Sequence, residues 1–372
     1  MARIEALPAH APSVRPRLTR QSLVALVAVS AVIIASIVSL VLGSGPLTRR
    51  LASATGSSAF GPGSPLLPVF QGPSHLMVLA VTGGSEPYVA LVGSRGHPAP
   101  LAVDVQPHIV LTLPGSGTGT VSDAAAGDLS LLSVSIENMV AAPVDHGVIL
   151  DTADLGRAVD AAGGIPVSLL DAETLGGRNV GPGTVKLSGR QVLDYLAAGR
   201  SFDRGDHWRA VLKGFLASGI AFRSDEVTGA DSLKGVNASL AAARGALTRE
   251  LPARESEGGL LLPLQGQIRG MLNGRLGMAV SEPVPIVVMN GSGKPGVGAE
   301  VAERLVPGGF QVVGSENAPK FNYKTTTVYA TTQSAFPAAE RAGKLLGVGA
   351  VTLGKSPVSG LADITIIVGR DF

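Results

Sequence analysis

The stretch "SVSIENMVAAPVDHGVILDTADLGRAVDAAGGIPVSL", residues 133–169, decides the fold class. Its apolar residues first recur at helical spacing, then form the short strand pattern "DHGVILD", then a second helical segment. A Gly-Gly pair ends that second helix, and "IPVSL" follows as another strand pattern. Glycine is favoured just after the last helical residue, and β-branched residues next to glycine favour strands. The alternation of helices and strands predicts an α/β fold.

Elements on both sides of this stretch extend the pattern. Asp128 is a good N-cap for a helix over 128–140, and Ser188 with Gln191 forms a capping box for a helix ending near Ala198. Three apolar segments upstream predict strands over 75–81, 88–93 and 100–105. Together they predict a mixed-sheet α/β domain over 75–282.

A second helix follows the loop after Ala198. Its apolar stripe consists of Trp208, Val211, Leu212, Phe215 and Leu216, at spacings of three and four residues. The chain's only tryptophan heads this stripe and is therefore expected in the core. Asp206 lies just before the stripe and is expected to be the N-cap of the helix.

Three other segments carry weaker signals. The Gly-rich run over 115–128 lacks the lysine and the spacing of a phosphate-binding loop, so we expect a flexible surface loop. Residues 229–280 are expected to form helices and loops, and Pro283 and Pro285 mark a boundary. The turn "NGSGKPG" (290–296) is expected to be structural, with anion binding near Lys294 as the alternative.

Residues 283–372 predict a second unit. Strand and helix patterns alternate there in the order βαββαββ within about 90 residues, which predicts a small α/β sandwich. The chain has no cysteine, which excludes disulfides and thiolate chemistry, and its net charge of +2 gives no general attraction to nucleic acid.

The N-terminal region predicts a membrane anchor. Residues 21–43 contain no charged side chain and are long enough to span a bilayer as a helix. Arginines precede the run, so we expect residues 1–20 in the cytoplasm. Residues 44–74, rich in Gly, Ser and Pro, are expected to be a linker to extracytoplasmic domains at the cell membrane. About 20 residues before the anchor are too few for a DNA-binding domain, so no nucleic-acid partner is expected.

Residues 283–372 resemble the LytR C-terminal domain of actinobacterial envelope proteins. The resemblance rests on "VMNGSG", "AEVAERLVPGGFQVVGSENA", "FNYKTTTVYA", "AAERAGKLLG" and "ADITIIVGRDF". Residues 75–282 resemble, less closely, the LytR-CpsA-Psr domain, through 133–169 and "GPGTVKLSGRQVLDYL" (181–196). That family moves glycopolymers from a polyprenyl-pyrophosphate carrier onto peptidoglycan. The resemblance implies arginines on the pyrophosphate, and acids that bind Mg²⁺ or act as a base.

The residues implied by this resemblance are mostly replaced. No Lys or Arg occurs between Arg95 and Arg157, so the family's arginine after the third strand is missing from "AVDVQP" (102–107). Glu86 and Asp104 are the remaining candidates for catalytic acids, with solvated loop acids as the alternative. Arg204 is in register with a family arginine, and Arg200 lies one residue late. Both are candidate anion-binding residues, with surface or ion-paired arginines as the alternative.

Two functions therefore stay open. The leading hypothesis is a non-catalytic or weakly active binding or scaffold protein in cell-wall glycopolymer assembly, whose partners are the carrier lipid, glycan, peptidoglycan or other envelope proteins. The alternative is an active phosphotransferase that uses Glu86 or Asp104 with Mg²⁺, and Arg200 and Arg204 on the pyrophosphate. No metal site is expected from histidine spacing, because His207 has no second histidine near it.

Overall fold

The computed structural model describes residues 75–94, 100–199, 204–224, 227–276, 282–347, 350–354 and 362–372. The expected anchor and its flanks, residues 1–74, lie outside these ranges, as does Arg200. Within the described ranges, no helix combines the length and the apolar character that a membrane span needs.

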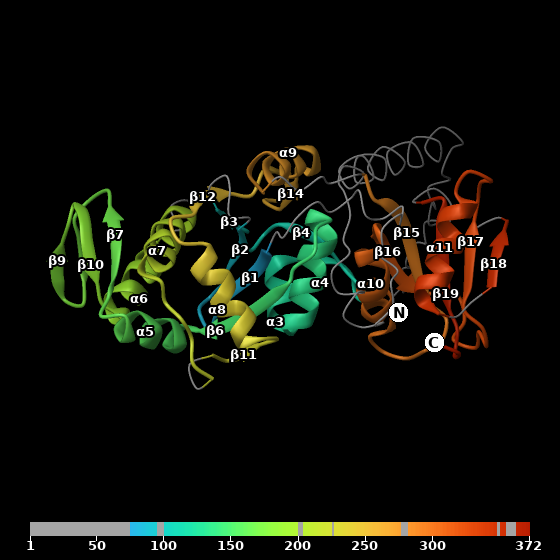
Figure 1. The fold of residues 1–372 in the computed structure, drawn as a ribbon, viewed down its shortest axis with the longest axis horizontal. Coiled ribbons are helices and arrows are strands. Elements are labelled where there is room, and N and C mark those ends of the chain that lie inside the picture. The colour runs from blue at the N-terminus through green and yellow to red at the C-terminus, as the bar shows by residue number, and fades with distance from the viewer. Residues whose placement is uncertain are drawn as a thin grey trace, which may run out of the picture. The chain divides into compact units, whose positions relative to one another are not determined.

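A six-stranded mixed sheet forms the first folded part, with the order β11-β6-β1-β2-β3-β12 (Figure 1). In that order the strands are β11 (Gly229–Ala230), β6 (His146–Asp151), β1 (His75–Thr82), β2 (Tyr88–Ser94), β3 (Leu101–Asp104) and β12 (Leu247–Glu250). β2 is antiparallel to β1 and β3, whereas β6 runs parallel to β1 and β12 runs parallel to β3. The expected mixed α/β fold is confirmed.

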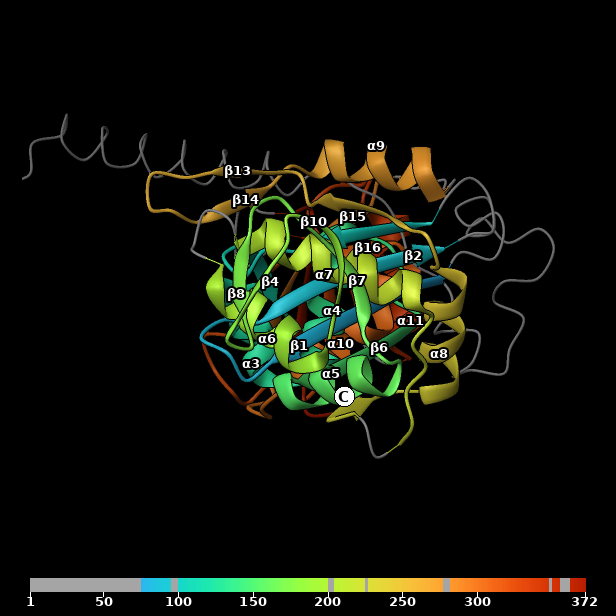
Figure 2. The same ribbon diagram turned by 90° about the vertical axis from the view of Figure 1, so that its left-hand side faces the viewer.

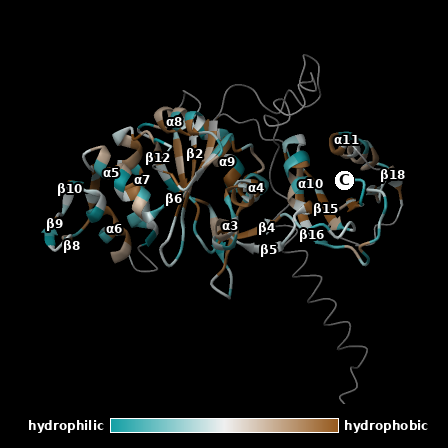
Figure 3. Cartoon of the chain, turned by 90° about the horizontal axis from the view of Figure 1, so that it is seen from below, coloured by the Kyte–Doolittle hydropathy of each residue, from teal (hydrophilic) through white to brown (hydrophobic). Residues whose placement is uncertain are grey.

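Helices cover both faces of this sheet because its strands are apolar on both faces. In β1, Val78 and Met77 are both 0% exposed but enter different cores, since successive strand residues point to opposite faces. Figure 3 shows the apolar strands between the two helix layers. One layer holds α3 (Val121–Gly127), α4 (Leu129–Val140) and α9 (Gln265–Leu276). The other holds α5 (Thr152–Ala161), α6 (Gly189–Ala198), α7 (Arg204–Ser218) and α8 (Leu233–Ala242).

Two helices begin at the capping residues that the sequence predicts. Asp128 Oδ1 accepts from the N–H of Leu131 at 2.7 Å and caps α4. Ser188 and Gln191 form the expected capping box of α6, which ends at Ala198. Trp208 is 1% exposed, so its expected core position is confirmed.

Three expectations are wrong. The run 115–128 is not a flexible loop, because it contains β5 (Gly117–Thr120), which pairs with β4 (Val110–Leu113), and then α3. Thr120 and Asp123 form a capping box at the start of α3, so a helix begins within this glycine-rich run.

Residues 229–280 also contain strands, including β12 and a hairpin of β13 (Ala253–Glu255) and β14 (Leu261–Pro263) beside α9 (Figures 1 and 2). Asp206 is not the N-cap of α7, because the helix begins at Arg204 and places Asp206 in its first turn.

Two small antiparallel ladders follow α5. β7 (Ile165–Leu169) pairs with β10 (Gly183–Leu187), and β8 (Glu173–Leu175) pairs with β9 (Arg178–Val180). β7 lies against α7, where a Cβ on Gly214 would come within 2.0 Å of the carbonyl oxygen of Pro166. Glycine therefore allows the helix and the strand to approach closely.

The C-terminal part is a five-stranded sheet with the order β16-β15-β19-β17-β18. Along the chain its elements are β15 (Val284–Asn290), α10 (Val297–Leu305), the 3-10 turn η2 (Val306–Gly308), β16 (Phe310–Asn317), β17 (Thr327–Ala330), α11 (Phe336–Leu346), β18 (Ala350–Leu353) and β19 (Ile364–Val368). This is the expected βαββαββ order. β15 is parallel to both β16 and β19, and β17 is antiparallel to β19.

A buried polar contact joins α4 to the edge strand β16. Asn138 Nδ2 donates to the carbonyl oxygen of Val312 at 2.8 Å, and Val312 N donates to Asn138 Oδ1 at 2.8 Å. Gln311 Nε2 donates to the carbonyl oxygen of Asn138 at 3.0 Å. The Asn138 amide thus pairs with one residue of the edge strand as a neighbouring strand would.

Candidate functional site

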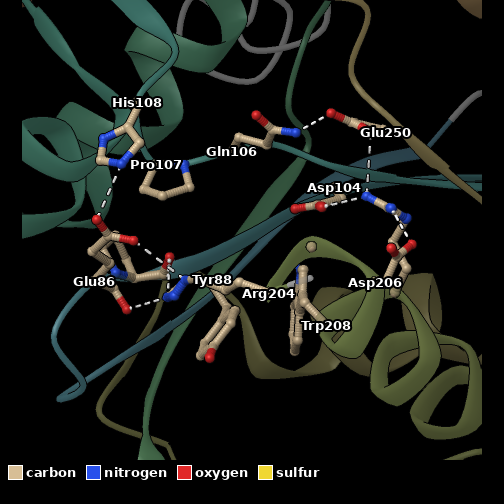
Figure 4. Close-up of a pocket in the computed structure, with 13 residues that line it drawn as sticks. Glu86, Tyr88, Asp104, Gln106, Pro107, His108, Arg204, Asp206, Trp208 and Glu250 are labelled. Atoms are coloured by element: carbon tan, nitrogen blue, oxygen red, sulfur yellow. Dashed lines mark hydrogen bonds and ion pairs between the residues drawn. The ribbon is translucent and has the colours of Figure 1, made fainter. Parts of the chain in front are cut away.

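A pocket of about 290 Å³ lies where β3, β12 and the β1–β2 loop meet the start of α7 (Figure 4). β3 and β12 are parallel and their last residues, Asp104 and Glu250, are paired in register, so both carboxylates reach the same edge. The pocket is lined by Glu86, Pro87, Tyr88, Asp104, Gln106, Pro107, His108, Arg204, Gly205, Asp206, Trp208, Arg209 and Glu250. Its volume lies just below the range of about 300–1,000 Å³ that is usual for small-molecule sites.

Arg204 is held on one side of the pocket. Its Nε lies 3.3 Å from Glu86 Oε2, and its Nη2 donates to the carbonyl oxygen of Glu86 at 2.7 Å. The guanidinium carbon also lies 3.8 Å from the centroid of the Tyr88 ring, a cation–π contact. With a side chain only 13% exposed, Arg204 has most of its donors turned to the protein itself.

Arg209 is held by three carboxylates, those of Asp104, Asp206 and Glu250, which lie away from Glu86 in Figure 4. Its Nη1 lies 3.0 Å from Asp104 Oδ2 and 3.5 Å from Glu250 Oε2. Its Nη2 lies 2.6 Å from Asp206 Oδ1, one helical turn away. The guanidinium thus lies among the three acids, in the position that a metal ion takes in an acidic site.

The pocket contains more negative than positive charge. Four carboxylates, those of Glu86, Asp104, Asp206 and Glu250, face two guanidinium groups. His108 Nε2 lies 3.2 Å from Glu86 Oε1 and adds a positive charge only when protonated.

Asp104 is a buried acid and not the solvated loop acid that the sequence left open. The residue is 4% exposed. Burial raises the pKa of its carboxyl to about 7, although the nearby Arg209 acts in the opposite direction. Burial also raises the pKa of the Tyr88 hydroxyl, partly offset by Arg204.

The pocket does not fit Mg²⁺. Glu86 and Asp104 each already face an arginine of the chain, within 3.3 and 3.0 Å. Among the described residues, no three acidic or histidine side chains are arranged to hold a metal ion. Hard cations need several oxygen ligands, which these paired carboxylates do not present.

The space behind the pocket is filled. Trp208, Val211 and Phe215 are at most 2% exposed and pack between the sheet and α7. His207 stacks on Tyr195 with ring centroids 4.0 Å apart, and its Nδ1 lies 2.8 Å from the carbonyl oxygen of Tyr195. These contacts give the aromatic residues and His207 packing roles.

The structure thus brings Glu86, Asp104 and Arg204 together in one pocket, whereas Arg200 lies outside the described residues. Sequence reasoning missed Arg209 and Glu250. Arg209 follows Asp206 by three residues, a spacing that indicates their ion pair. Glu250 carried no such signal, because its place depends on the pairing of β12 with β3.

Comparison with known families matches the C-terminal part alone. Residues 283–372 match the family LytR_C, described as "LytR cell envelope-related transcriptional attenuator". No curated protein matches the chain.

Solved structures resemble the chain over slightly more than half its length. A transcriptional regulator from Enterococcus faecalis is 16% identical with a TM-score of 0.48, covering 56% of this chain and 89% of its own. Bacillus subtilis TagU is 16% identical with a TM-score of 0.46, covering 57% and 98%. The LytR-CPS2A-psr family protein YwtF (TagT), solved with bound octaprenyl pyrophosphate lipid, is 19% identical with a TM-score of 0.45, covering 55% and 90%.

Proposed function

We propose that this chain is a non-catalytic envelope protein of LytR-CpsA-Psr type, which binds or scaffolds other components during cell-wall glycopolymer assembly. The observation that carries the proposal is the pairing of both pocket arginines, Arg204 and Arg209, with carboxylates of the chain. The sequence resemblance over 75–282 and the LytR_C match over 283–372 support the envelope role.

Charge argues against a pyrophosphate in this pocket. A pyrophosphate ester needs cationic donors turned toward its oxygens. Arg204 and Arg209 would have to leave Glu86 and Asp104, and Asp104 would then remain buried without its partner. The carboxylates of the pocket outnumber its guanidinium groups and would also repel the incoming anion.

The inner end of the pocket supports the same conclusion. A polyprenyl chain needs a long apolar channel, whereas this pocket ends at the buried Trp208. We therefore favour partners that are recognised outside this pocket, such as the glycan, peptidoglycan or sister transferases. The expected anchor over 21–43 would hold the chain at the outer face of the cell membrane.

One observation favours the alternative of an active phosphotransferase. Glu86, Asp104 and Arg204, three of the residues that such an enzyme would use, line the same pocket. In that alternative, Arg204 would exchange Glu86 for a phosphate oxygen when the donor binds.

A transfer assay decides between the two. The native chain is incubated with a polyprenyl-pyrophosphate-linked glycan and peptidoglycan, beside Arg204→Ala and the control Arg178→Ala, which alters an exposed arginine of β9. We expect no transfer above the protein-free reaction for any of the three. Native turnover that is lost in Arg204→Ala and kept in Arg178→Ala would establish the enzyme instead.

A further inference from the structure

The C-terminal sheet brings three connecting segments to one edge. β16, β15 and β19 are neighbours and run in the same direction, so their carboxyl ends meet there. The segments are residues 291–296 after β15, 318–326 after β16 and 369–372 after β19. In α/β sheets, ligands are commonly bound outside the carboxyl ends of parallel strands.

Backbone hydrogen bonds tie these segments to one another. Tyr323 N donates to the carbonyl oxygen of Gly291 at 3.2 Å, and Arg370 N donates to that of Tyr323 at 3.0 Å. Within the first segment, Asn290 Oδ1 accepts from the N–H groups of Ser292 and Gly293 at 3.2 and 3.0 Å. The side chains of this edge therefore project from a fixed platform.

An aromatic ring is exposed on this platform. Phe321 is 48% exposed, although large apolar side chains are usually buried. It lies against Gly293, where a Cβ would come within 3.2 Å of the Phe321 Cβ and where φ is +79°. Arg370 Nη2 donates to the carbonyl oxygen of Phe321 at 3.2 Å, which places the guanidinium beside this residue.

The same segments carry a cluster of positive charge. Four exposed basic residues lie on them: Lys294, Lys320, Lys324 and Arg370. The acids of this edge are Glu316, which is exposed near the end of β16, and Asp371, whose Oδ1 accepts from Thr326 N and Oγ1 at 2.7 Å each. The edge thus has a net positive charge, unlike the pocket.

We infer that this edge, formed by Lys294, Lys320, Phe321, Lys324 and Arg370, is a binding surface for an anionic glycan. The C–H face of a sugar ring would stack on Phe321, and its carboxylate or phosphate groups would pair with the lysines and Arg370. A single exposed aromatic residue among cations fits a charged sugar chain better than a lipid bilayer, which requires a wider apolar face. This surface shares no residue with the pocket, so glycan binding there does not depend on whether the pocket is catalytic.

The test is calorimetric titration of the full chain with oligogalacturonate and with its methyl ester, which has the same rings without the charge. We expect binding of the acid form alone. Phe321→Ala and Arg370→Gln should each weaken it by about two- to fivefold, the loss expected for one exposed contact. Two controls outside the C-terminal part, Leu170→Ala at an 86% exposed residue and Lys234→Gln at an exposed one, should leave it unchanged.

Several results would overturn this inference. They are the absence of oligogalacturonate binding, equal binding of the methyl ester, or equal loss in the control variants. Binding to phosphatidylglycerol vesicles in place of oligogalacturonate would identify a membrane-docking surface instead. Thermal unfolding of each variant shows whether the fold is kept, and Lys294→Gln offers a second variant on a different segment should Phe321→Ala be unstable.

Discussion

At Asp104, burial and ion pairing shift the pKa of the carboxyl group in opposite directions. Arg209 lies 3.0 Å away and favours the charged carboxylate, but burial dominates and raises the pKa to about 7. The folded protein therefore binds a proton at Asp104 more tightly than the unfolded chain does. Between the ordinary pKa and the raised one, stability must fall as the pH rises.

Replacing Asp104 by Asn tests this pH dependence. The amide cannot ionise, yet its oxygen can still accept from Arg209. We expect the native chain to lose stability between pH 5 and pH 8, and Asp104→Asn to lose clearly less. Urea unfolding at both pH values measures the difference, with Asp171→Asn at an exposed loop as the control. The same pH dependence in all three chains would show that Asp104 does not control it.

Arg209 is the residue that pairs with three of the four pocket carboxylates. Removing its guanidinium leaves Asp104, Asp206 and Glu250 around an empty position, so we expect Arg209→Ala to gain affinity for a divalent cation such as Mn²⁺. Weak carboxylate sites of this kind have dissociation constants on the order of 10⁻⁴–10⁻³ M.

Calorimetric titration with Mn²⁺ measures that gain against the native chain. Arg209→Met, which retains most of the apolar stem, serves as a second variant if the alanine variant is unstable. If neither variant binds Mn²⁺ more tightly than the native chain, the three acids do not form the latent cation site that we describe.

Among the elements, α7 is the helix that positions the pocket arginines, and its place depends on Gly214. A Cβ there would lie 2.0 Å from the carbonyl oxygen of Pro166 in β7, so the helix would have to move away from the strand. We expect Gly214→Ala to lower the free energy of unfolding by about 1–3 kcal/mol. Gly270→Ala on α9, where a Cβ meets nothing within 4 Å, should instead raise it by about 0.5–1 kcal/mol. Urea unfolding compares them, and equal effects would contradict the packing that we describe.

The elements that the sequence predicted are those with local signals. Capping side chains at Asp128 and Ser188 set the starts of α4 and α6, and the stripe headed by Trp208 identified α7. The run 115–128 was misinterpreted because its many glycines outweighed the capping box at Thr120. β12 was missed because its strand character comes from pairing with β3, far away in the sequence.

In the candidate site, the sequence predicted which residues take part but not how they pair. Glu86, Asp104 and Arg204 could be named from the resemblance to a family, because register with a motif is a local property. Their pairing depends on which strand ends and helix starts meet in space. For this reason the sequence did not identify the partner of Arg204, which is Glu86 from the β1–β2 loop.

At the scale of the whole molecule, Asn138 connects the mixed sheet domain to the C-terminal sheet. Its amide satisfies both the N–H and the C=O of Val312 in a buried place, so Asn138→Ala leaves two buried backbone groups without partners. Each such group costs about 1–3 kcal/mol. We expect the native chain to unfold in one calorimetric transition and Asn138→Ala to unfold in two. Asn322→Ala, at an exposed residue, is the control, and a single unshifted transition in Asn138→Ala would show that this contact does not couple the two parts.

In this pocket the carboxylates of the chain occupy the arginines that a pyrophosphate would need. Calorimetric titration with farnesyl pyrophosphate tests it, comparing the native chain with the double variant Glu86→Gln/Glu250→Gln, in which two of the four pocket carboxylates are neutralised. We expect the native chain to bind no more tightly than about 1 mM and the double variant to bind at least about tenfold more tightly, an effect of ~1.4 kcal/mol. Micromolar binding to the native chain, unchanged in the double variant, would contradict it.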